Sequence, residues 1–276
     1  MDACGKVADV VEVNGATLYY EKQGTGPSIL LIAGSTGDAG HFSRSADLLA
    51  DEFTVVVYDR RGNSRSPRPP GWIVTSVAEQ ADDAAGLIRA LGLAPVVVFG
   101  ASAGAPIALD VMLRHGHLVR AGILQDPSVF SVLPDPLEPV IPRRRILEEA
   151  LRTSGPRGAI EALLRYLNDD AFFAAVPADV LERMLGNADT ILTIESAGFA
   201  GWPLTRQDIA SLRMPVSLMI AAETLPEYWK VAAWLADALK VEPMTVPGKH
   251  PFYCYRPQDL ADALRTILRR ASRTRH

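Results

Sequence analysis

Most positions are apolar in six short runs along the chain, at residues 28–33, 54–59, 95–100, 121–126, 215–220 and 241–246. Runs without strict polar alternation are typical of strands that are covered on both faces, as in a parallel sheet. Stretches of helical periodicity separate several of these runs, at residues 76–91 and 105–114, and another closes the chain at 257–270. The pattern therefore predicts an α/β fold with a mostly parallel central sheet flanked by helices.

An antiparallel hairpin is predicted ahead of these runs. Two strand-like stretches, residues 8–13 and 17–21, flank the pair Asn14 and Gly15. Asn-Gly suits the two-residue type I′ turn, because both of its central residues need positive φ. We expect the chain to begin with this hairpin.

The alternation of strands and helices stops between residues 128 and 211. This segment carries consecutive helical stretches, at 147–151, 159–167 and 180–192, without a strand between them. It begins in a proline-rich stretch and returns through Gly201, Trp202 and Pro203, where the glycine and the proline mark a turn. The predicted division is a core of residues 1–127 and 212–276 with an inserted helical cap, or lid, of residues 128–211.

The sequence Gly100-Ala101-Ser102-Ala103-Gly104 lies directly between a predicted strand and a predicted helix. Such a G-x-S-x-G segment also occurs as an ordinary tight turn. In a strand-turn-helix setting, however, it fits a nucleophile elbow, where glycines allow a sharp turn that exposes the serine hydroxyl. We expect Ser102 to be a nucleophile and the backbone N–H of Ala103 to be one donor of an oxyanion hole.

A serine nucleophile needs a hydrogen-bonded base, and the chain order of such sites places that base after the last strand. His250 lies in the loop that follows residues 241–246 and can reach back over the sheet. His41 is a candidate substrate contact or packing residue, and His115 and His117 resemble surface or cap residues. His250 is therefore the predicted base for Ser102.

The second oxyanion donor is expected in the glycine-rich loop at residues 33–37, after the third strand. Glycines permit a backbone to turn its amides inward, although the same composition also fits a plain turn. We predict the backbone N–H of Ser35 as the donor and Gly34 as a substrate contact.

With these features the chain resembles the α/β-hydrolase superfamily over nearly its whole length. Residues 59–66 look like the D-x-R-G-x-G-x-S turn common in that superfamily, with Ser64 in place of the second glycine. Residues 33–35 depart from the usual His-Gly pair after the same strand, so no histidine role is carried over there. The resemblance implies the α/β-hydrolase fold and serine-hydrolase chemistry, for which we expect no cofactor and no metal.

Two carboxylates compete for the third position of the triad. In the commonest arrangement of the superfamily the acid follows the strand before the last, where residues 220–226 offer Glu223 but lack a G-x-x-D pattern. Asp126 ends an earlier strand and precedes Pro127, an arrangement that resembles the zearalenone-lactonase-like subgroup. That subgroup typically carries Glu at this place. The sequence favours Asp126 and leaves Glu223 as the alternative.

The expected activity is hydrolysis of a small, hydrophobic ester or lactone beneath the lid, with Trp202 and Phe199 as substrate contacts. A serine at the elbow argues against dehalogenase and epoxide-hydrolase chemistry, which use an aspartate nucleophile. Thioesterase, carbon–carbon hydrolase and perhydrolase activities share the same triad, and a non-catalytic small-molecule receptor is a further alternative.

The composition of the chain limits the classes of binding partner that we expect. The 276 residues are 48% hydrophobic and 22% charged, with a formal charge of -4, which gives no electrostatic reason to expect a nucleic-acid partner. The chain shows neither a secretion signal nor an apolar stretch of membrane-spanning length, and Cys4 and Cys254 supply no disulfide framework. We expect a cytoplasmic enzyme with a small-molecule substrate and no membrane partner, and we leave a homodimer open.

Overall fold

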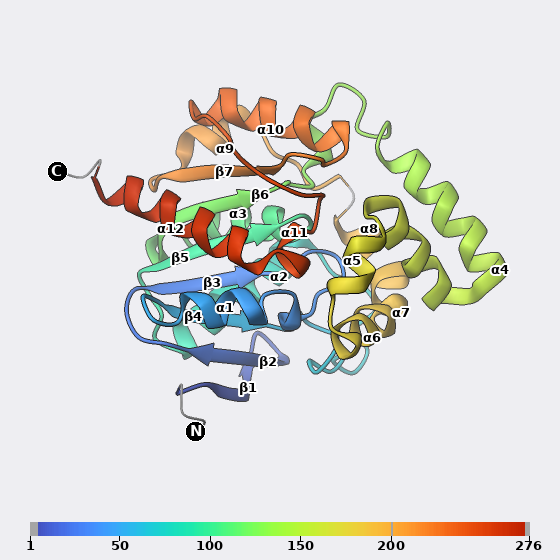
Figure 1. Cartoon of the computed structure of the whole chain (residues 1–276), viewed down its shortest axis with the longest axis horizontal. Helices are drawn as coiled ribbons and strands as arrows, with labels where there is room; N and C mark the ends of the chain where they lie inside the picture. Colours follow the sequence, from blue (N-terminus) through green and yellow to red (C-terminus); the bar gives the residue numbers. More distant parts are fainter. Residues whose placement is uncertain (1–4, 200, 274–276) are drawn as a thin grey trace.

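The computed structural model describes residues 5–199 and 201–273, so Cys4 lies outside the described residues. Within them, eight strands form one sheet in the order β1-β2-β4-β3-β5-β6-β7-β8 (Figure 1). The strands are β1 (Val7–Val13), β2 (Ala16–Gln23), β3 (Ser28–Ile32), β4 (Thr54–Tyr58), β5 (Val96–Ala101), β6 (Val119–Gln125), β7 (Val216–Ala221) and β8 (Met244–Val246).

The sheet is parallel except at its first edge. β1 pairs antiparallel with β2, and β2 pairs antiparallel with β4. All other neighbouring strands are parallel. The predicted hairpin is confirmed, with Asn14 at φ 49° and Gly15 at φ 72° in its turn. The mostly parallel sheet is confirmed as well, so the carboxyl ends of β3, β5, β6, β7 and β8 share one edge.

Helices cover both faces of this sheet (Figure 1). In β3, Leu31 belongs to the apolar cluster beneath α1 and α12, whereas Leu30 belongs to the cluster beneath α2, α3 and α10. Both side chains are fully buried, which explains why the strands are apolar at nearly every position. These helices are α1 (Ser43–Leu49), α2 (Val77–Ala90), α3 (Gly104–Arg114), α10 (Pro226–Leu239) and α12 (Pro257–Arg273).

Between β6 and β7 the chain forms a group of helices that lies beyond one end of the strands (Figure 1). The group comprises α4 (Val140–Leu167), α5 (Asp170–Ala175), α6 (Ala178–Gly186), α7 (Ala188–Thr190), the π-helical turn η4 (Ile191–Glu195) and α8 (Ser196–Phe199). We call α4 to α8, with η4, the inserted helices. The next helix, α9 (Arg206–Ser211), instead lies beside α10 at the sheet. The remaining short elements are η1 (Ala39–His41), η2 (Gly116–Leu118), η3 (Phe130–Val132) and α11 (Phe252–Tyr255).

The longest helix, α4, is broken at Gly155, whose φ of 70° and ψ of -175° are not helical. The cause is the following residue, Pro156, because proline pushes its predecessor out of the helical region. After the break, Ile160 and Leu164 join the apolar cluster beneath α1 and α12. No helix in the described ranges, α4 included, is both long and apolar enough to cross a membrane.

Candidate active site

The nucleophile candidate Ser102 lies in a strained turn between β5 and α3. Its φ of 53° is unusual for a residue with a side chain. The turn is tight enough that a Cβ on Gly100 would lie 2.4 Å from the Gly104 carbonyl oxygen, and one on Gly104 would lie 2.4 Å from that of Ile32. Glycine is therefore required on both sides, as the G-x-S-x-G pattern predicts.

The structure brings Ser102, His250 and Asp126 together at the carboxyl edge of the sheet. Ser102 Oγ lies 2.8 Å from His250 Nε2, and His250 Nδ1 lies 3.0 Å from Asp126 Oδ2. The second carboxylate oxygen, Oδ1, accepts a hydrogen bond from the Ala221 amide at 2.9 Å. All three residues are buried, and Asp126 is 0% exposed.

The end of β6 and the residues after it form hydrogen bonds with the backbones of both Ser102 and His250. The Gln125 carbonyl accepts from the Ser102 amide at 2.9 Å, and the Gln125 side-chain amide donates to the His250 carbonyl at 2.9 Å. The next residue, Asp126, turns at a φ of 37°, after which the Ser128 amide donates to the Ser102 carbonyl at 3.2 Å. Gln125 and Ser128, which flank Asp126 in the chain, thus fix the backbones of serine and histidine relative to the carboxylate.

Glu223, the alternative acid, is not brought to the imidazole. Its side chain is exposed, and its backbone N–H donates to the Gly248 carbonyl at 2.9 Å. In effect, the loop after β7 supports the loop that carries His250. The carboxylate at Nδ1 is that of Asp126.

The loop after β3 lies against the nucleophile. A Cβ added to Gly34 would lie 3.0 Å from Ser102 Cβ, so this close approach needs glycine. The Gly34 carbonyl accepts from Arg60 Nη2 at 2.9 Å and from the Gly37 amide at 3.0 Å. Because N–H and C=O point in opposite directions across a trans peptide, these bonds also set the direction of the Ser35 N–H.

Arg60 links this loop to the inserted helices. Its guanidinium, fully buried, donates to both carboxylate oxygens of Glu195 at 2.7 and 2.8 Å. Asn63 donates to the same carboxylate at 2.9 Å. A buried ion pair needs such additional partners, because desolvation of both charges is costly. The position of the Gly34 peptide therefore depends on a residue of the π-helical turn η4.

A cavity of about 580 Å³ opens in front of Ser102. Ser35, Ala103 and Phe199 are among the residues that line it, whereas Trp202 is not. Trp202 packs instead against the apolar cluster of α2, α3 and α10. Aliphatic side chains of α4 and η4 form much of the wall, including Leu147, Ile160, Leu163, Leu164, Leu167 and Ile191.

Three polar residues of the cavity were not predicted from the sequence. The Tyr228 ring stacks on the His250 imidazole, with centroids 4.1 Å apart and planes at 23°. Ser128 Oγ lies 3.2 Å from Ser102 Oγ. The Arg143 guanidinium lies 5.5 Å from the centre of the Tyr228 ring. Only the nearness of Ser128 to Asp126 in the chain could have suggested any of them.

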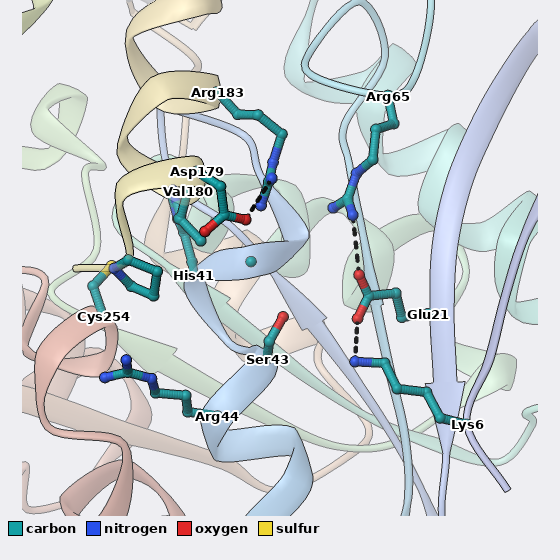
Figure 2. Close-up of a pocket in the computed structure, with 12 residues that line it drawn as sticks. Lys6, Glu21, His41, Ser43, Arg44, Arg65, Asp179, Val180, Arg183 and Cys254 are labelled. Atoms are coloured by element: carbon teal, nitrogen blue, oxygen red, sulfur yellow. Dashed lines mark hydrogen bonds and ion pairs between the residues drawn. The ribbon is translucent and has the colours of Figure 1, made fainter. Parts of the chain in front are cut away.

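A second, charged cavity of about 240 Å³ lies where β2 and η1 meet α6. Figure 2 shows the Glu21 carboxylate between Lys6 and Arg65, which it contacts at 2.7 and 3.1 Å. Arg183 of α6 forms an ion pair with the buried Asp38 at 2.6 Å. These cations are already paired with carboxylates of the chain, and the Arg183–Asp38 pair fastens α6 to the core.

His41 and Cys254 line both cavities. Burial lowers the pKa of His41 to about 4, so the imidazole is neutral near pH 7. Burial also raises the pKa of the Cys254 thiol well above its ordinary value, which leaves it protonated and a poor nucleophile. Neither residue competes with Ser102 as a reactive group. Across residues 5–199 and 201–273, no cluster of three or more His, Cys, Asp or Glu is arranged to hold a metal ion.

Comparison with known proteins identifies the family. The family described as alpha/beta hydrolase fold matches residues 27–151. The chain is 30% identical over 265 residues to the uncharacterized hydrolase YraK of Bacillus subtilis (strain 168), with 94% of each protein covered. It is also 30% identical over 140 residues to zearalenone hydrolase of Bionectria ochroleuca, across 44% of this chain and 53% of that protein.

Solved structures show the same architecture. A thermophilic esterase from Thermogutta terrifontis superposes with a TM-score of 0.77 at 24% identity, covering 96% of this chain and 99% of the esterase. At that identity the likeness establishes the fold alone. The match to YraK extends over nearly the whole length of both proteins. The chain therefore belongs to the α/β-hydrolase family and is a hydrolytic enzyme, as the resemblance in its sequence implied.

Proposed function

We propose that the protein is a serine hydrolase that cleaves a hydrophobic ester or lactone with Ser102, His250 and Asp126 as its triad. The observation that carries this proposal is the continuous contact from Ser102 Oγ through His250 to Asp126, at 2.8 and 3.0 Å. A serine hydroxyl becomes a useful nucleophile only with such a base, and the base needs an orienting acid.

In the proposed cycle, Ser102 Oγ attacks the substrate carbonyl carbon while its proton passes to His250 Nε2. The carbonyl π electrons move to the oxygen, and Asp126 stabilises the imidazolium. Collapse of this intermediate expels the alcohol, which takes the proton from His250. Water then attacks the acyl-enzyme with His250 as base again, and the acid is released as Ser102 regains its proton. A lactone would keep its leaving alcohol tethered in the product.

The oxyanion would be held by the backbone N–H groups of Ser35 and Ala103. Two facts support this assignment: both residues line the cavity beside Ser102, and Arg60 holds the carbonyl of the Gly34–Ser35 peptide on its opposite edge. Donors that are fixed before the reaction need no reorganisation when charge develops, and each contributes a few kcal/mol, about 2.7–4, to the barrier reduction.

The substrate class follows from the wall of the cavity. Side chains such as Leu163 and Leu167 favour an aliphatic portion, because apolar surface gains about 25 cal/mol per Å² on burial. Zearalenone hydrolase, by its name, hydrolyses zearalenone. Together with the resemblance of this chain to the zearalenone-lactonase-like subgroup, that relation makes lactones a first choice for assay. We further propose that the inserted helices act as a lid that shields the bound substrate from bulk solvent and shapes specificity.

The test is a screen of the purified enzyme and its Ser102→Ala variant against aryl esters, macrolactones and thioesters, with labelling by a fluorophosphonate probe. We expect turnover and labelling of the natural sequence and loss of both in the variant. Full activity of Ser102→Ala would overturn the proposal. Labelling with less than one turnover on every substrate would favour a small-molecule receptor instead.

A further inference from the structure

The nucleophile has a second polar neighbour besides its base. Ser128 Oγ lies 3.2 Å from Ser102 Oγ, in the same cavity. The proposed mechanism gives Ser128 no role, yet few side chains in an active site touch the reacting atom itself. The direction of this hydrogen bond decides what Ser128 can do.

Ser102 has a single hydroxyl hydrogen. When His250 is neutral and donates Nδ1–H to Asp126, its Nε2 is an acceptor and takes the Ser102 hydrogen. No hydrogen then remains on Ser102 for Ser128. In the reactive arrangement, Ser128 is therefore the donor and Ser102 Oγ is the acceptor.

The surroundings of Ser128 are buried and aromatic. Tyr228 lines the same cavity as Ser128 and stacks on the His250 imidazole, with the ring centroids 4.1 Å apart. Burial raises the pKa of the Tyr228 phenol, so this neighbour of Ser128 is neutral at working pH. The donor role of Ser128 therefore rests on its contact with Ser102 Oγ, in a pocket where Tyr228 holds the imidazole in place.

We propose that Ser128 is a further catalytic residue, whose hydroxyl stabilises negative charge on Ser102 Oγ in both halves of the reaction. During attack, Ser102 loses its proton to His250 while its bond to carbon is still forming, and its oxygen carries partial charge. During deacylation the same oxygen is the leaving group and carries charge until His250 returns the proton. Ser128 keeps its own proton throughout, and Tyr228 is a positioning residue that stacks on His250.

The inference rests on the proposed function, so the experiment separates the two. Fluorophosphonate labelling rates and kcat and KM for 4-nitrophenyl butyrate are measured for the natural sequence, Ser128→Ala, Ser128→Thr and Tyr228→Phe. Ser45→Ala is the matched control, because Ser45 is a buried serine outside the cavity that donates to the Pro257 carbonyl.

A hydrogen bond to a charged atom predicts that Ser128→Ala lowers kcat and the labelling rate about 10- to 100-fold with KM little changed. Ser128→Thr keeps the hydroxyl and should recover most of that loss. Tyr228→Phe keeps the ring on His250 and should lose less than Ser128→Ala. Ser45→Ala should label at the natural rate.

Natural labelling and kcat in a folded Ser128→Ala variant would overturn the role of Ser128 while leaving the triad intact. An effect on KM alone, or no recovery with threonine, would also reject it. Equal labelling of the natural sequence and Ser102→Ala would instead reject the proposed function itself.

Discussion

Exchange of Asp126 for asparagine tests the triad most sharply, because the structure fixes which atom replaces which. Asp126 Oδ1 accepts from the Ala221 amide at 2.9 Å, and Oδ2 faces His250 Nδ1 at 3.0 Å. In Asp126→Asn the amide oxygen must stay at the Ala221 N–H, since two donors would otherwise face each other. The side-chain NH₂ then points at His250 Nδ1.

That NH₂ group can only donate, so Nδ1 must become an acceptor and the imidazole proton moves to Nε2. Nε2 can then no longer take the proton of Ser102. A triad held in the wrong tautomer loses about 10⁴-fold in kcat, or about 5.5 kcal/mol of barrier. We expect Asp126→Asn to lose about 10³- to 10⁴-fold in kcat with a folded structure and little change in KM.

The assay is steady-state hydrolysis of 4-nitrophenyl butyrate, with the thermal midpoint measured alongside. Glu223→Gln is the matched control, because this carboxylate is exposed on the neighbouring loop. It should retain kcat within about threefold, as is usual for changes at exposed positions. A loss below tenfold in Asp126→Asn, or an equal loss in Glu223→Gln, would refute the assignment.

Three further outcomes follow from buried contacts. Glu195→Ala leaves the Arg60 charge buried without its carboxylate and should lower the free energy of unfolding by about 3–5 kcal/mol in urea titrations. His41 has a pKa of about 4 when folded, against an ordinary value of 6.5, so the unfolded chain binds the extra proton as pH falls between these values. The natural sequence should therefore lose up to about 3 kcal/mol of stability from pH 7 to pH 4, and His41→Gln should lose less, as urea titrations at each pH would show. Gly34→Ala brings a methyl group 3.0 Å from Ser102 Cβ and should lower kcat about tenfold or more, with near-natural secondary structure by circular dichroism.

Local sequence signals were sufficient for the sheet, the hairpin and the elbow, because each depends on neighbours within a few residues. The apolar run before Gly100 and the Asn14 and Gly15 turn are such cases. Helices α1 and α10 are not predicted from the sequence, because their apolar positions can be recognised as a buried face only when the helices pack against the sheet. For α10, Tyr228 is buried by stacking on His250, a residue that lies 22 positions further along the chain (250 minus 228).

The site was predictable where a motif marks it and not where contacts come from distant segments. The sequence left Asp126 and Glu223 as competing acids, because a strand order in space cannot be read from spacing in the chain. It named Trp202 as a substrate contact on its position at a turn, but the ring packs in the α2, α3 and α10 cluster. The ion pair of Arg60 with Glu195 joins residues 135 positions apart, and neither segment carries a sequence pattern that indicates it.

The bridge from Glu195 through Arg60 to the Gly34 carbonyl has a consequence for selectivity. A ligand that fits poorly under the inserted helices would displace η4, and the displaced glutamate would release the guanidinium that orients the Gly34–Ser35 peptide. Poor fit would then weaken transition-state stabilisation as well as affinity. We expect badly matched compounds to have a lower kcat as well as weaker binding. How tightly a compound binds would therefore not by itself show how fast it is hydrolysed.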